Sequence, residues 1–446
     1  MRKYEFGTSG IRGLFGTEVD VRLAMELGSV LIEKPGWRVV IGRDTRTTGQ
    51  ALEMALAAGV LSAGGVPVAV GIAPIPTTAL AAKNHGNAGV MITASHNPPE
   101  YNGFKLFNGK GEEVGPERER EIEQRLRAGE FNATGWEAVQ AAESIDCAVR
   151  EHIDLVLSLI DTKAIERKRP KVVVDCGNGA ASVIMPYVLR EAGARVIAVN
   201  AEPSGFFNRG LEPNEENLGG TAAIARAVGA DMAIAHDGDA DRAVILDEKG
   251  EMLGLDAQLA MMCEEVLKHR KGKIVSTIEA SLLVKERVEK AGGKLLITKV
   301  GSLNCARLMR RSGAIFAGEP CGEYIFTGGV PLPDGVLTGL KFVEYLCHNG
   351  RLGARRERFK VYPMKRAKYP AKDKKAAMER IKDEVRAAFE GKLFEEDGIR
   401  VDMEDGWLLV RASGTEPVIR ITAEHRRRDG LAKLFRKAEA IVKKYT

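Results

Sequence analysis

Three carboxylates stand at alternate positions in one short segment, as Asp237, Asp239 and Asp241. Apolar runs flank this segment at residues 230–235 and 243–246, so we expect a tight turn between two buried strands. Carboxylates packed this closely would repel one another, whereas their oxygens suit a hard cation such as Mg²⁺. The spacing therefore predicts a metal site at these three residues. A solvated acidic turn is the alternative interpretation.

A serine follows another buried run. Ser95 and His96 come directly after the apolar residues 88–92, and Lys105 lies a little further along. In α/β proteins the turns that leave the carboxyl ends of sheet strands present reactive groups. Ser95 is therefore a candidate nucleophile, although the same residues also form ordinary turns. Because no G-x-S-x-G pattern surrounds Ser95, an esterase is less favoured.

Three further loops combine arginine, hydroxyl groups and glycine. In residues 411–417 these groups could form a nest for a phosphate dianion, or the hydroxyls could satisfy their own backbone. Residues 7–13 make a similar loop near the N-terminus. Residues 318–324 could hydrogen-bond a polyol or form a structural turn.

The elements that carry these loops alternate between β-branched runs and amphipathic helices. A strand at 37–42 is followed by a helix at 47–63, and the pattern restarts at 171–175 and at 273–278. Strands that alternate with helices indicate βαβ units and mostly parallel sheets. We therefore expect three similar α/β domains with mixed, mostly parallel sheets. The uncharged residues 54–82 fit helix, strand and helix of such a core better than a membrane span.

The C-terminal part has a different order of elements. Strands are expected in succession between two helices, which indicates a smaller α+β domain. The expected helices are 373–389 and 430–444, with strands at 399–403, 407–411 and 418–423. We place the domains at 1–148, 149–252, 253–360 and 361–446.

The composition excludes several classes of protein. The 446 residues carry 66 Lys and Arg against 61 Asp and Glu, which is no nucleic-acid-binding signature. Six cysteines without a C-x-x-C pair argue against a disulfide framework or a zinc ribbon. No signal peptide or membrane span is recognised, so we expect a cytoplasmic protein. A P-loop is absent, and the glycines at 177–182 are a poor dinucleotide fingerprint.

Together, the five loops resemble those of the α-D-phosphohexomutase family along the whole chain. The matching segments are G-T-S-G-I-R-G at 7–13, T-A-S-H-N-P at 93–98, D-G-D-A-D-R at 237–242, G-E-P-C-G-E-Y at 318–324 and R-A-S-G-T-E-P at 411–417. Each segment alone is weak evidence, but five in the right order are specific. The resemblance implies four domains around a central cleft, the first three of them α/β.

The resemblance also implies a mechanism. Ser95 would be carried as a phosphoserine, would give its phosphoryl group to a hexose phosphate, and would recover the other phosphate from the resulting bisphosphorylated sugar. A phosphoserine oxygen and the three aspartates would hold Mg²⁺. Arg12, Lys105 and His96 would surround the reacting group. Hexose 1,6-bisphosphate would act as an activator, and a hinge is expected near residue 360.

Substrate contacts are likewise implied by the resemblance. We name residues 237–241 the metal loop, residues 318–324 the sugar loop and residues 411–417 the phosphate loop. Contacts are expected at Arg242 after the metal loop, at Glu319, Cys321 and Glu323 in the sugar loop, and at Arg411, Ser413, Gly414 and Thr415 in the phosphate loop.

The sugar loop departs from the common family pattern G-E-x-S-G-H. Cys321 replaces the serine and Glu323 replaces the histidine, so the proton-transfer role of that histidine does not carry over. The G-E-P-C-G sequence resembles archaeal phosphoglucosamine mutases, and we expect glucosamine 6-phosphate as the substrate. The alternatives are a broad phosphomannomutase/phosphoglucomutase, a metal-dependent sugar phosphatase and a non-catalytic sugar-phosphate binder. No nucleic acid or membrane partner is expected, and the chain would be a monomer or homodimer.

Overall fold

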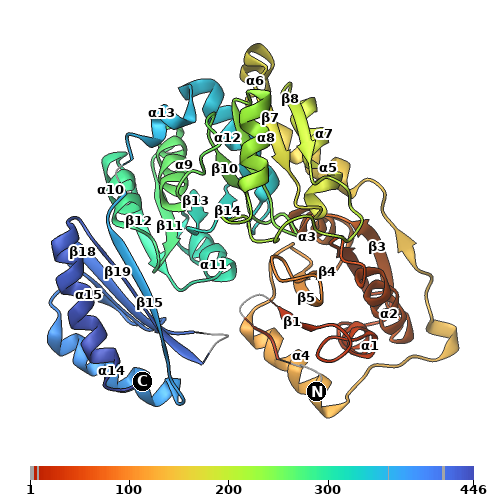
Figure 1. Ribbon diagram of the computed structural model, residues 1–446. Coiled ribbons are helices and arrows are strands. Elements are labelled where there is room, and N and C mark those ends of the chain that lie inside the picture. Colours follow the sequence, from red (N-terminus) through yellow and green to blue (C-terminus); the bar gives the residue numbers. More distant parts are fainter. Residues whose placement is uncertain (1–4, 8–9, 360, 414–416) are drawn as a thin grey trace. The chain divides into compact units, whose positions relative to one another are not determined.

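The N-terminal apolar runs form a six-stranded mixed sheet in the order β1-β5-β4-β2-β3-β6 (Figure 1). The computed structural model describes residues 5–7, 10–359, 361–413 and 417–446. The strands are β1 (Ile11–Leu14), β2 (Arg38–Arg43), β3 (Val66–Ile72), β4 (Ala88–Ile92), β5 (Tyr101–Asn108) and β6 (Glu143–Ser144). The helices are α1 (Val21–Val30), α2 (Gly49–Ser62), α3 (Ile75–His85) and α4 (Pro116–Ala128).

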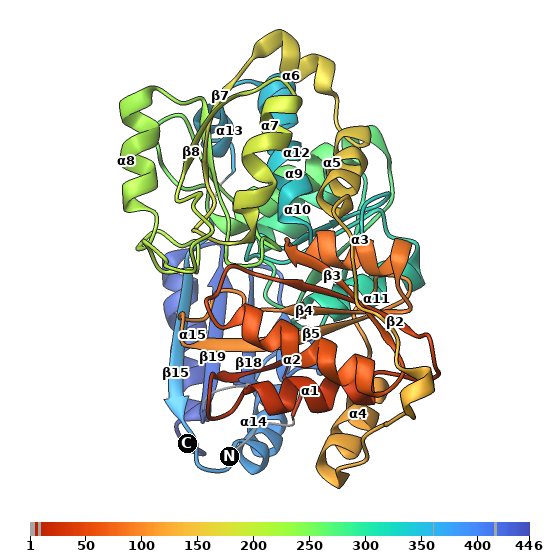
Figure 2. The same ribbon diagram turned by 90° about the vertical axis from the view of Figure 1, so that its right-hand side faces the viewer.

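Helices cover both faces of this sheet (Figure 2). Successive side chains of a strand point to opposite faces. In β2, Val39 and Ile41 join the core beneath α1 and α2, whereas Val40 joins the core beneath α3. A sheet covered on both faces explains why its parallel strands are continuous apolar runs. The uncharged residues 54–82 form helix, strand and helix of this core, as expected.

A second, four-stranded sheet follows in the order β10-β9-β7-β8. Its strands are β7 (Lys171–Asp175), β8 (Arg195–Val199), β9 (Met232–Ala235) and β10 (Val244–Leu246). The helical segments that follow β6 in this region are α5 (Ala148–Ser158), α6 (Thr162–Lys168), η2 (Ala180–Val183), α7 (Met185–Glu191) and α8 (Gly219–Val228), whereas η1 (Trp136–Ala138) precedes β6 in the first region. Strands β9 and β10 pair antiparallel, so residues 236–243 connect two buried strands as predicted.

The chain divides into two units. The first runs to Leu253 and resumes at Cys321–Arg356, and the second comprises Gly254–Pro320 and the residues from Glu357 onward. The first unit therefore also contains β14 (Tyr324–Phe326), α12 (Gly335–Asn349) and α13 (Leu352–Arg356).

The second unit begins with a third α/β region. Strands β12 and β13 both pair parallel with β11, so β11 lies between them. The elements are α9 (Leu255–His269), β11 (Lys273–Thr277), α10 (Leu282–Lys290), β12 (Lys294–Thr298), α11 (Ser302–Ser312) and β13 (Phe316–Gly318).

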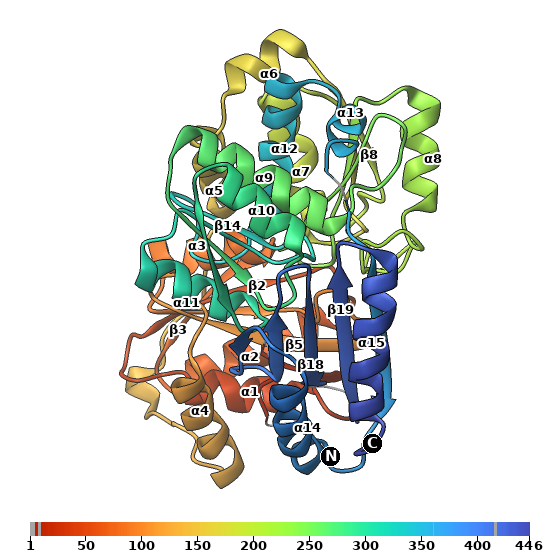
Figure 3. The same ribbon diagram turned by 90° about the vertical axis from the view of Figure 1, so that its left-hand side faces the viewer.

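The C-terminal region forms a five-stranded antiparallel sheet in the order β15-β19-β18-β17-β16, with two helices on one face (Figure 3). Its elements are β15 (Met364–Pro370), α14 (Lys374–Ala388), β16 (Lys392–Phe394), β17 (Ile399–Asp402), β18 (Gly406–Ala412), β19 (Val418–His425) and α15 (Arg428–Val442). Strands β15 and β16 lie at the two edges and were not predicted. Edge strands often carry charged residues, and the lysines and arginine of β15 hide the usual strand signal.

The opposite face of this C-terminal sheet packs against the third α/β region. Trp407 and Leu409 form one apolar cluster with Ile278 and Leu282. The buried carboxylate of Glu424 accepts hydrogen bonds from the hydroxyl of Ser281, from the backbone N–H of Leu282 at 2.8 Å and from the Trp407 indole. These contacts explain why both regions belong to one unit.

The expected fold class is confirmed. Three regions contain helices alternating with mostly parallel strands, and the last contains an antiparallel sheet with two helices. Within the described ranges, no helix is both long enough and apolar enough to cross a membrane.

Candidate active site

The three carboxylates between β9 and β10 are within reach of a single ion. Asp237, Asp239 and Asp241 each offer an oxygen, and these oxygens all lie within 4.8 Å of one another. All three residues are buried. Oδ1 of Asp239 and Oδ1 of Asp241 accept no hydrogen bond from the described residues, and Oδ2 of Asp239 contacts only the ammonium group of Lys105 among them. Oxygens of this kind suit a hard divalent cation, so the cluster is a candidate metal site.

Backbone N–H groups at the starts of helical segments donate hydrogen bonds to the backbone carbonyls of this metal loop. The carbonyl of Gly238 accepts from Ala180 N–H at 2.9 Å, at the start of η2. The carbonyls of Asp239 and Ala240 accept from Ile75 N–H and Gly335 N–H, the first residues of α3 and α12, at 2.9 and 3.1 Å. The first N–H groups of a helix have no partner inside the helix. They therefore turn the loop carbonyls outward and leave the carboxylates to converge.

Ser95 lies against the metal loop in an uncommon backbone conformation. Its φ of +50° lies in the left-handed region, which a non-glycine residue rarely adopts. The Ser95 hydroxyl donates to Asp237 Oδ2 at 2.8 Å, and Ser95 N–H donates to the Thr93 hydroxyl at 2.8 Å. Gly238 is required here, because a Cβ at that position would lie 2.5 Å from the Ser95 carbonyl oxygen. The structure thus brings the predicted nucleophile to the predicted metal site.

Arg46 holds the loop at residues 95–101, which we name the serine loop. The role of Arg46 was not predicted from the sequence. Its buried guanidinium donates to the carbonyls of Ser95, Asn97, Pro98 and Tyr101 at 3.0, 2.7, 2.5 and 2.9 Å. The guanidinium also forms a buried ion pair of 3.0 Å with Asp44. Four carbonyls on one fixed cation constrain the whole loop. The only local signal is a charged pair directly after the apolar strand β2.

Lys105 lies on β5 rather than on a loop, and its ammonium group faces the aspartates. Its Nζ lies 3.0 Å from Asp239 and 2.9 Å from Asp241. Burial opposes the charged form of this lysine, but the two carboxylates outweigh burial and raise the pKa of Lys105 above its ordinary value. Burial would also raise the pKa of Asp239, yet Lys105 and Arg12 hold the pKa of that carboxyl below its usual range. Lys105 is therefore a cation at neutral pH.

The pKa of Asp237 is shifted in the opposite direction to that of Asp239. Burial, together with the charges of Asp241 and Asp239, raises the pKa of Asp237 well above its ordinary value. Three buried carboxylates with one lysine between them are thus electrostatically strained, and a divalent cation would relieve that strain.

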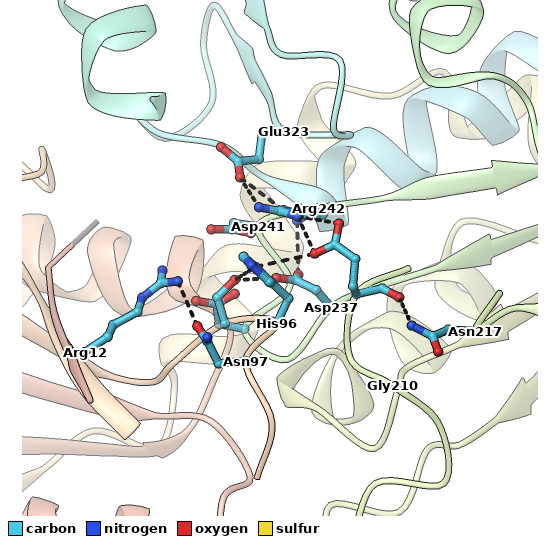
Figure 4. A network of polar contacts seen from close by, with 12 residues as sticks. Arg12, His96, Asn97, Gly210, Asn217, Asp237, Asp241, Arg242 and Glu323 are labelled. Carbon is cyan, nitrogen blue, oxygen red and sulfur yellow. Dashed lines mark hydrogen bonds and ion pairs between the residues drawn. The ribbon is translucent and has the colours of Figure 1, made fainter. Parts of the chain in front are cut away.

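Arg12 and His96 complete the group around Ser95 (Figure 4). The Arg12 guanidinium lies 3.5 Å from the Asn97 side-chain oxygen, and its buried Nε donates no hydrogen bond within the part of the chain that is described. Nδ1 of His96 lies 3.3 Å from the Ser95 hydroxyl. Burial and the charge of Arg242 lower the pKa of His96 to about 4. His96 is therefore neutral at pH 7.

Arg242 links the metal loop to the sugar loop (Figure 4). Its guanidinium donates to Glu323 at 3.1 Å and to both carboxylate oxygens of Glu212 at 2.8 and 2.9 Å. Backbone pairing between Arg242 and Glu323 supports this contact. Glu212 also lies 3.6 Å from Nδ1 of His96. Glu212 was not identified from sequence, because it lies in the long connection between β8 and α8.

Two of the expected sugar-loop residues lie in different units. Cys321 is partly buried and belongs to the first unit, with Glu323. Glu319 is buried and belongs to the second unit, where its Oε2 accepts from the backbone N–H of Gly301 at 3.1 Å.

The expected phosphate loop also belongs to the second unit. The Arg411 guanidinium lies 3.1 Å from Glu279 and 3.7 Å from Asp397, and its buried Nε donates no hydrogen bond among the described residues. Ser413 is buried beside it. Gly414 and Thr415 lie outside the described residues. An arginine Nε that is buried without an acceptor is compatible with an anion at this loop.

Four family profiles match this chain in order. They are the α/β/α domains I, II and III of phosphoglucomutase/phosphomannomutase, at residues 3–133, 150–250 and 255–362, and the C-terminal domain of the same proteins at 364–441. The chain belongs to the phosphoglucomutase/phosphomannomutase family. It is an isomerase of the phosphohexomutase type, as expected from the five loops.

Curated relatives of this family match almost end to end. A probable phosphoglucosamine mutase of Thermococcus gammatolerans is 40% identical over 444 residues, which is 98% of each chain. A phosphoglucomutase/phosphomannomutase of Thermococcus kodakarensis is also 40% identical, over 431 residues and 94% of each chain. Because the chain is equally identical to both kinds of enzyme, overall sequence identity does not indicate which hexose phosphate is its substrate.

Solved structures of the family have the same fold. A phosphoglucomutase/phosphomannomutase family protein from Burkholderia thailandensis has a TM-score of 0.87 at 27% identity, covering 99% of this chain and 98% of that one. The N-acetylphosphoglucosamine mutase of Aspergillus fumigatus, solved with GlcNAc-6P and magnesium, has a TM-score of 0.62 at 17% identity, covering 100% and 96%. The second likeness shows the fold alone.

Proposed function

We propose that this phosphohexomutase converts glucosamine 6-phosphate to glucosamine 1-phosphate by way of a phosphoserine at Ser95. The observation that carries the proposal is the 2.8 Å hydrogen bond from the Ser95 hydroxyl to Asp237, which joins the serine to the buried aspartate cluster. Phosphoryl transfer depends on positioning and on charge stabilisation, and this arrangement supplies both.

The proposed reaction uses two transfers. The phosphoserine gives its phosphoryl group to the free hydroxyl of the hexose phosphate, the Ser95 Oγ–P bond breaks, and a 1,6-bisphosphate forms. After the sugar reorients, the other phosphate returns to Ser95. Hexose 1,6-bisphosphate would therefore activate enzyme molecules whose Ser95 has lost its phosphate. In the second transfer the sugar O–P bond breaks as the Ser95 Oγ–P bond forms again. In each transfer the accepting hydroxyl loses a proton and the oxygen that leaves the phosphorus gains one, so protons balance.

The residues present fit Mg²⁺. Three buried carboxylates offer hard oxygen ligands, and several of these oxygens accept no hydrogen bond within the described ranges. Asp237, Asp239, Asp241 and an oxygen of the phosphoserine would hold the ion. When bound, Mg²⁺ would neutralise negative charge on the transferring phosphoryl group.

The neighbouring cations have complementary roles in this proposal. Lys105 remains protonated beside Asp239 and Asp241, so we assign it to charge stabilisation rather than to acceptance of a proton. Arg12 would contact the phosphoryl group through donors that include its Nε, which has no acceptor among the described residues. Neutral His96 would orient oxygens of the phosphoserine.

The non-reacting phosphate would bind at the C-terminal loop. Arg411, Ser413, Gly414 and Thr415 provide a guanidinium, two hydroxyls and the backbone N–H of a glycine. Such groups recognise a phosphate dianion. Binding there would have to compete with Glu279 and Asp397 for the Arg411 guanidinium.

The sugar is assigned from the sugar loop. Glu323 and Glu212 share the single guanidinium of Arg242, so this triad carries two carboxylates and one cation. The excess negative charge favours the 2-ammonium group of glucosamine over the 2-hydroxyl of glucose or mannose. Glu319 and Cys321 would contact the remaining sugar hydroxyls.

A broad phosphomannomutase/phosphoglucomutase is the second candidate. It is favoured by the direct contact of Glu323 with Arg242, because this ion pair reduces the charge that Glu323 could offer to an ammonium group. A metal-dependent phosphatase would need water at the phosphoserine, and a sugar-phosphate-binding protein would need no Ser95 chemistry.

A coupled assay of the purified chain tests these candidates. Glucosamine 6-phosphate, mannose 1-phosphate and glucose 1-phosphate are compared in the presence of Mg²⁺ and a trace of hexose 1,6-bisphosphate, with Ser95→Ala as the control. Preference for glucosamine 6-phosphate supports the proposal. Equal or better turnover of the other sugars supports the second candidate. Release of inorganic phosphate identifies a phosphatase, and activity that survives in Ser95→Ala excludes the phosphoserine mechanism.

A further inference from the structure

A histidine, a cysteine and a glutamate meet outside the site described above. His85 is the last residue of α3, Cys147 precedes the first residue of α5, and Glu151 lies one turn into α5. Each offers one ligand atom, and the three atoms lie within 4.8 Å of one another. Helices α3 and α5 lie side by side (Figures 1 and 2). Cys147 and Glu151 are four residues apart, which places them on one face of the helix start.

One oxygen of Glu151 lies at the centre of the cluster. Oε1 of Glu151 is 2.8 Å from Nε2 of His85 and 3.3 Å from Sγ of Cys147. The second oxygen, Oε2, accepts from the Asn84 amide at 2.9 Å, which orients the carboxylate. Nε of Arg38 donates to the His85 carbonyl at 2.8 Å and fixes the backbone from which the imidazole extends. The carboxylate of Glu151 and the backbone of His85 are therefore held in place by a second set of contacts.

We propose that His85, Cys147 and Glu151 bind Zn²⁺ and thereby tie α3 to α5. A thiolate, an imidazole and a carboxylate are the usual zinc ligands, and the thiolate makes the set a poor one for Mg²⁺. Tetrahedral zinc places such donors roughly 3.3 to 3.6 Å apart, so only small movements are needed here. The side chains of His85 and Glu151 are 29% and 28% exposed, and Cys147 is exposed. An ion can therefore enter, and water can take the fourth position.

Bound Zn²⁺ would take the place of the protons that now form hydrogen bonds to Glu151. The hydrogen bond to Glu151 raises the pKa of the Cys147 thiol, whereas bound zinc requires the thiolate. The thiol proton would leave to solvent, and His85 would bind as neutral imidazole through Nε2. Because Cys147 stands at the N-terminus of α5, the helix favours the thiolate once it forms. Zinc affinity is therefore expected to increase with pH.

Cobalt distinguishes this site from the aspartate site, because only a site with a thiolate ligand gives a cobalt–thiolate absorption band. Co²⁺ is added to the full chain in excess Mg²⁺, and the near-ultraviolet charge-transfer band of a cobalt–thiolate bond is recorded. The wild type is expected to show this band, saturating at one equivalent, and Zn²⁺ is expected to displace it. Cys147→Ser abolishes the band, whereas Cys347→Ser, which changes another incompletely buried thiol, retains it. Asn84→Ala is expected to weaken Zn²⁺ binding about tenfold, as loss of a supporting contact does.

Absence of the band in the wild type, or an unchanged band in Cys147→Ser, would overturn the proposal. His85→Ala distinguishes a three-residue site from a thiol that binds metal by itself, because unchanged Zn²⁺ affinity in this variant would also refute it. With excess Mg²⁺ present to occupy the aspartate site, the thermal midpoint of the wild type is expected to increase more with Zn²⁺ than that of Cys147→Ser. None of these readouts depends on mutase activity, so the outcome is independent of the proposed function.

Discussion

The guanidinium of Arg46 donates to the carbonyl oxygen of Ser95 at 3.0 Å, and this contact fixes the residue proposed to carry the phosphoryl group. Ser95 adopts a left-handed backbone that costs energy for a residue with a Cβ. Such a conformation persists only where its surroundings determine it. Arg46 provides that constraint from one side, and the Thr93 hydroxyl, which accepts from Ser95 N–H, provides it from the other.

Arg46→Lys is therefore expected to reduce kcat/KM although the charge is kept. A lysine has a single ammonium group and cannot reproduce the forked contacts to four carbonyls. A displacement of about 1 Å in a reacting group can cost about 100-fold in rate, and we expect a loss of that order. Steady-state kinetics of the mutase reaction measure it.

Arg43→Lys is the matched control for this variant. Arg43 lies three residues earlier, is partly exposed and pairs with Glu53 rather than with the serine loop. It is expected to retain near wild-type kinetics. Wild-type activity in Arg46→Lys would show that the serine loop holds its geometry without the guanidinium fork.

Asp237→Asn is expected to stabilise the metal-free protein while it damages the site. The folded pKa of Asp237 is raised, mainly by burial and then by Asp241 and Asp239. A raised carboxyl pKa means that the folded state binds the proton more tightly than the unfolded state. Wild-type stability without metal should therefore fall as the pH rises from the ordinary aspartate range through this raised pKa. The asparagine removes that dependence.

Magnesium should reverse the order of the two proteins. The wild type should gain stability from Mg²⁺, because a ligand that binds only the folded state shifts unfolding by mass action. Asp237→Asn should lose more than about tenfold in Mg²⁺ affinity, since removal of a ligand costs at least as much as removal of a supporting contact. Thermal unfolding with chelator and with Mg²⁺, across a pH series, gives both results. If Mg²⁺ stabilised the two proteins equally, Asp237 would not be a ligand of the ion.

The parts of this protein that could be predicted from sequence are those encoded locally. Strands such as β4 and β7 are continuous apolar runs because both faces of their sheets are covered, and both strands were predicted at their observed bounds. The aspartate loop was identified because its three carboxylates lie within five residues. Ser95 was singled out because it follows such a strand, and the structure places it beside Asp237.

Contacts between distant residues could not be predicted in this way. The carbonyls that Arg46 binds lie 49 to 55 residues further along the chain. Glu212 reaches Arg242 from a loop with no regular pattern. Strand β5 was missed because Asn102 and Lys105 interrupt its apolar run, and both are buried in the fold. Buried polar residues of this kind conceal the strand that carries them.

The second unit contains a pH-sensitive carboxyl at the start of α9. Burial, and then the charge of Glu424, raise the pKa of Asp256 to about 7. The stability contributed by the protonated form is present at low pH and is lost as the pH rises toward 7. The free energy of unfolding should fall by up to about 1.4 kcal/mol per pH unit in this range. Asp256→Asn should remove this slope.

Trp407 offers a fluorescent probe for this measurement, since it is buried in the second unit beside Glu424. Urea unfolding is followed in a background in which Trp37 and Trp136 are replaced by phenylalanine. Asp383→Asn, at a side chain that is 77% exposed, is the control and should keep the wild-type slope. A slope that persists in Asp256→Asn would assign the titration to another group.

Glu323→Gln tests the assignment of the sugar. The change keeps the size of the side chain and removes its charge, so Arg242 would pair with Glu212 alone and the excess negative charge of the triad would disappear. If an ammonium group of the substrate interacts with that charge, kcat/KM for glucosamine phosphate should fall about tenfold more than kcat/KM for glucose phosphate, which corresponds to one charged hydrogen bond. Rates with both sugars are measured in the same preparation, so a general loss caused by displacement of Arg242 cancels in the ratio.

Glu212→Gln is the companion variant, because it removes a charge of the same triad outside the sugar loop. A selective effect of Glu323→Gln alone would place the ammonium at Glu323, and a selective effect of both variants would indicate recognition by the charge of the triad. Equal losses for the two sugars in Glu323→Gln would show that this glutamate supports Arg242 and does not select the substrate.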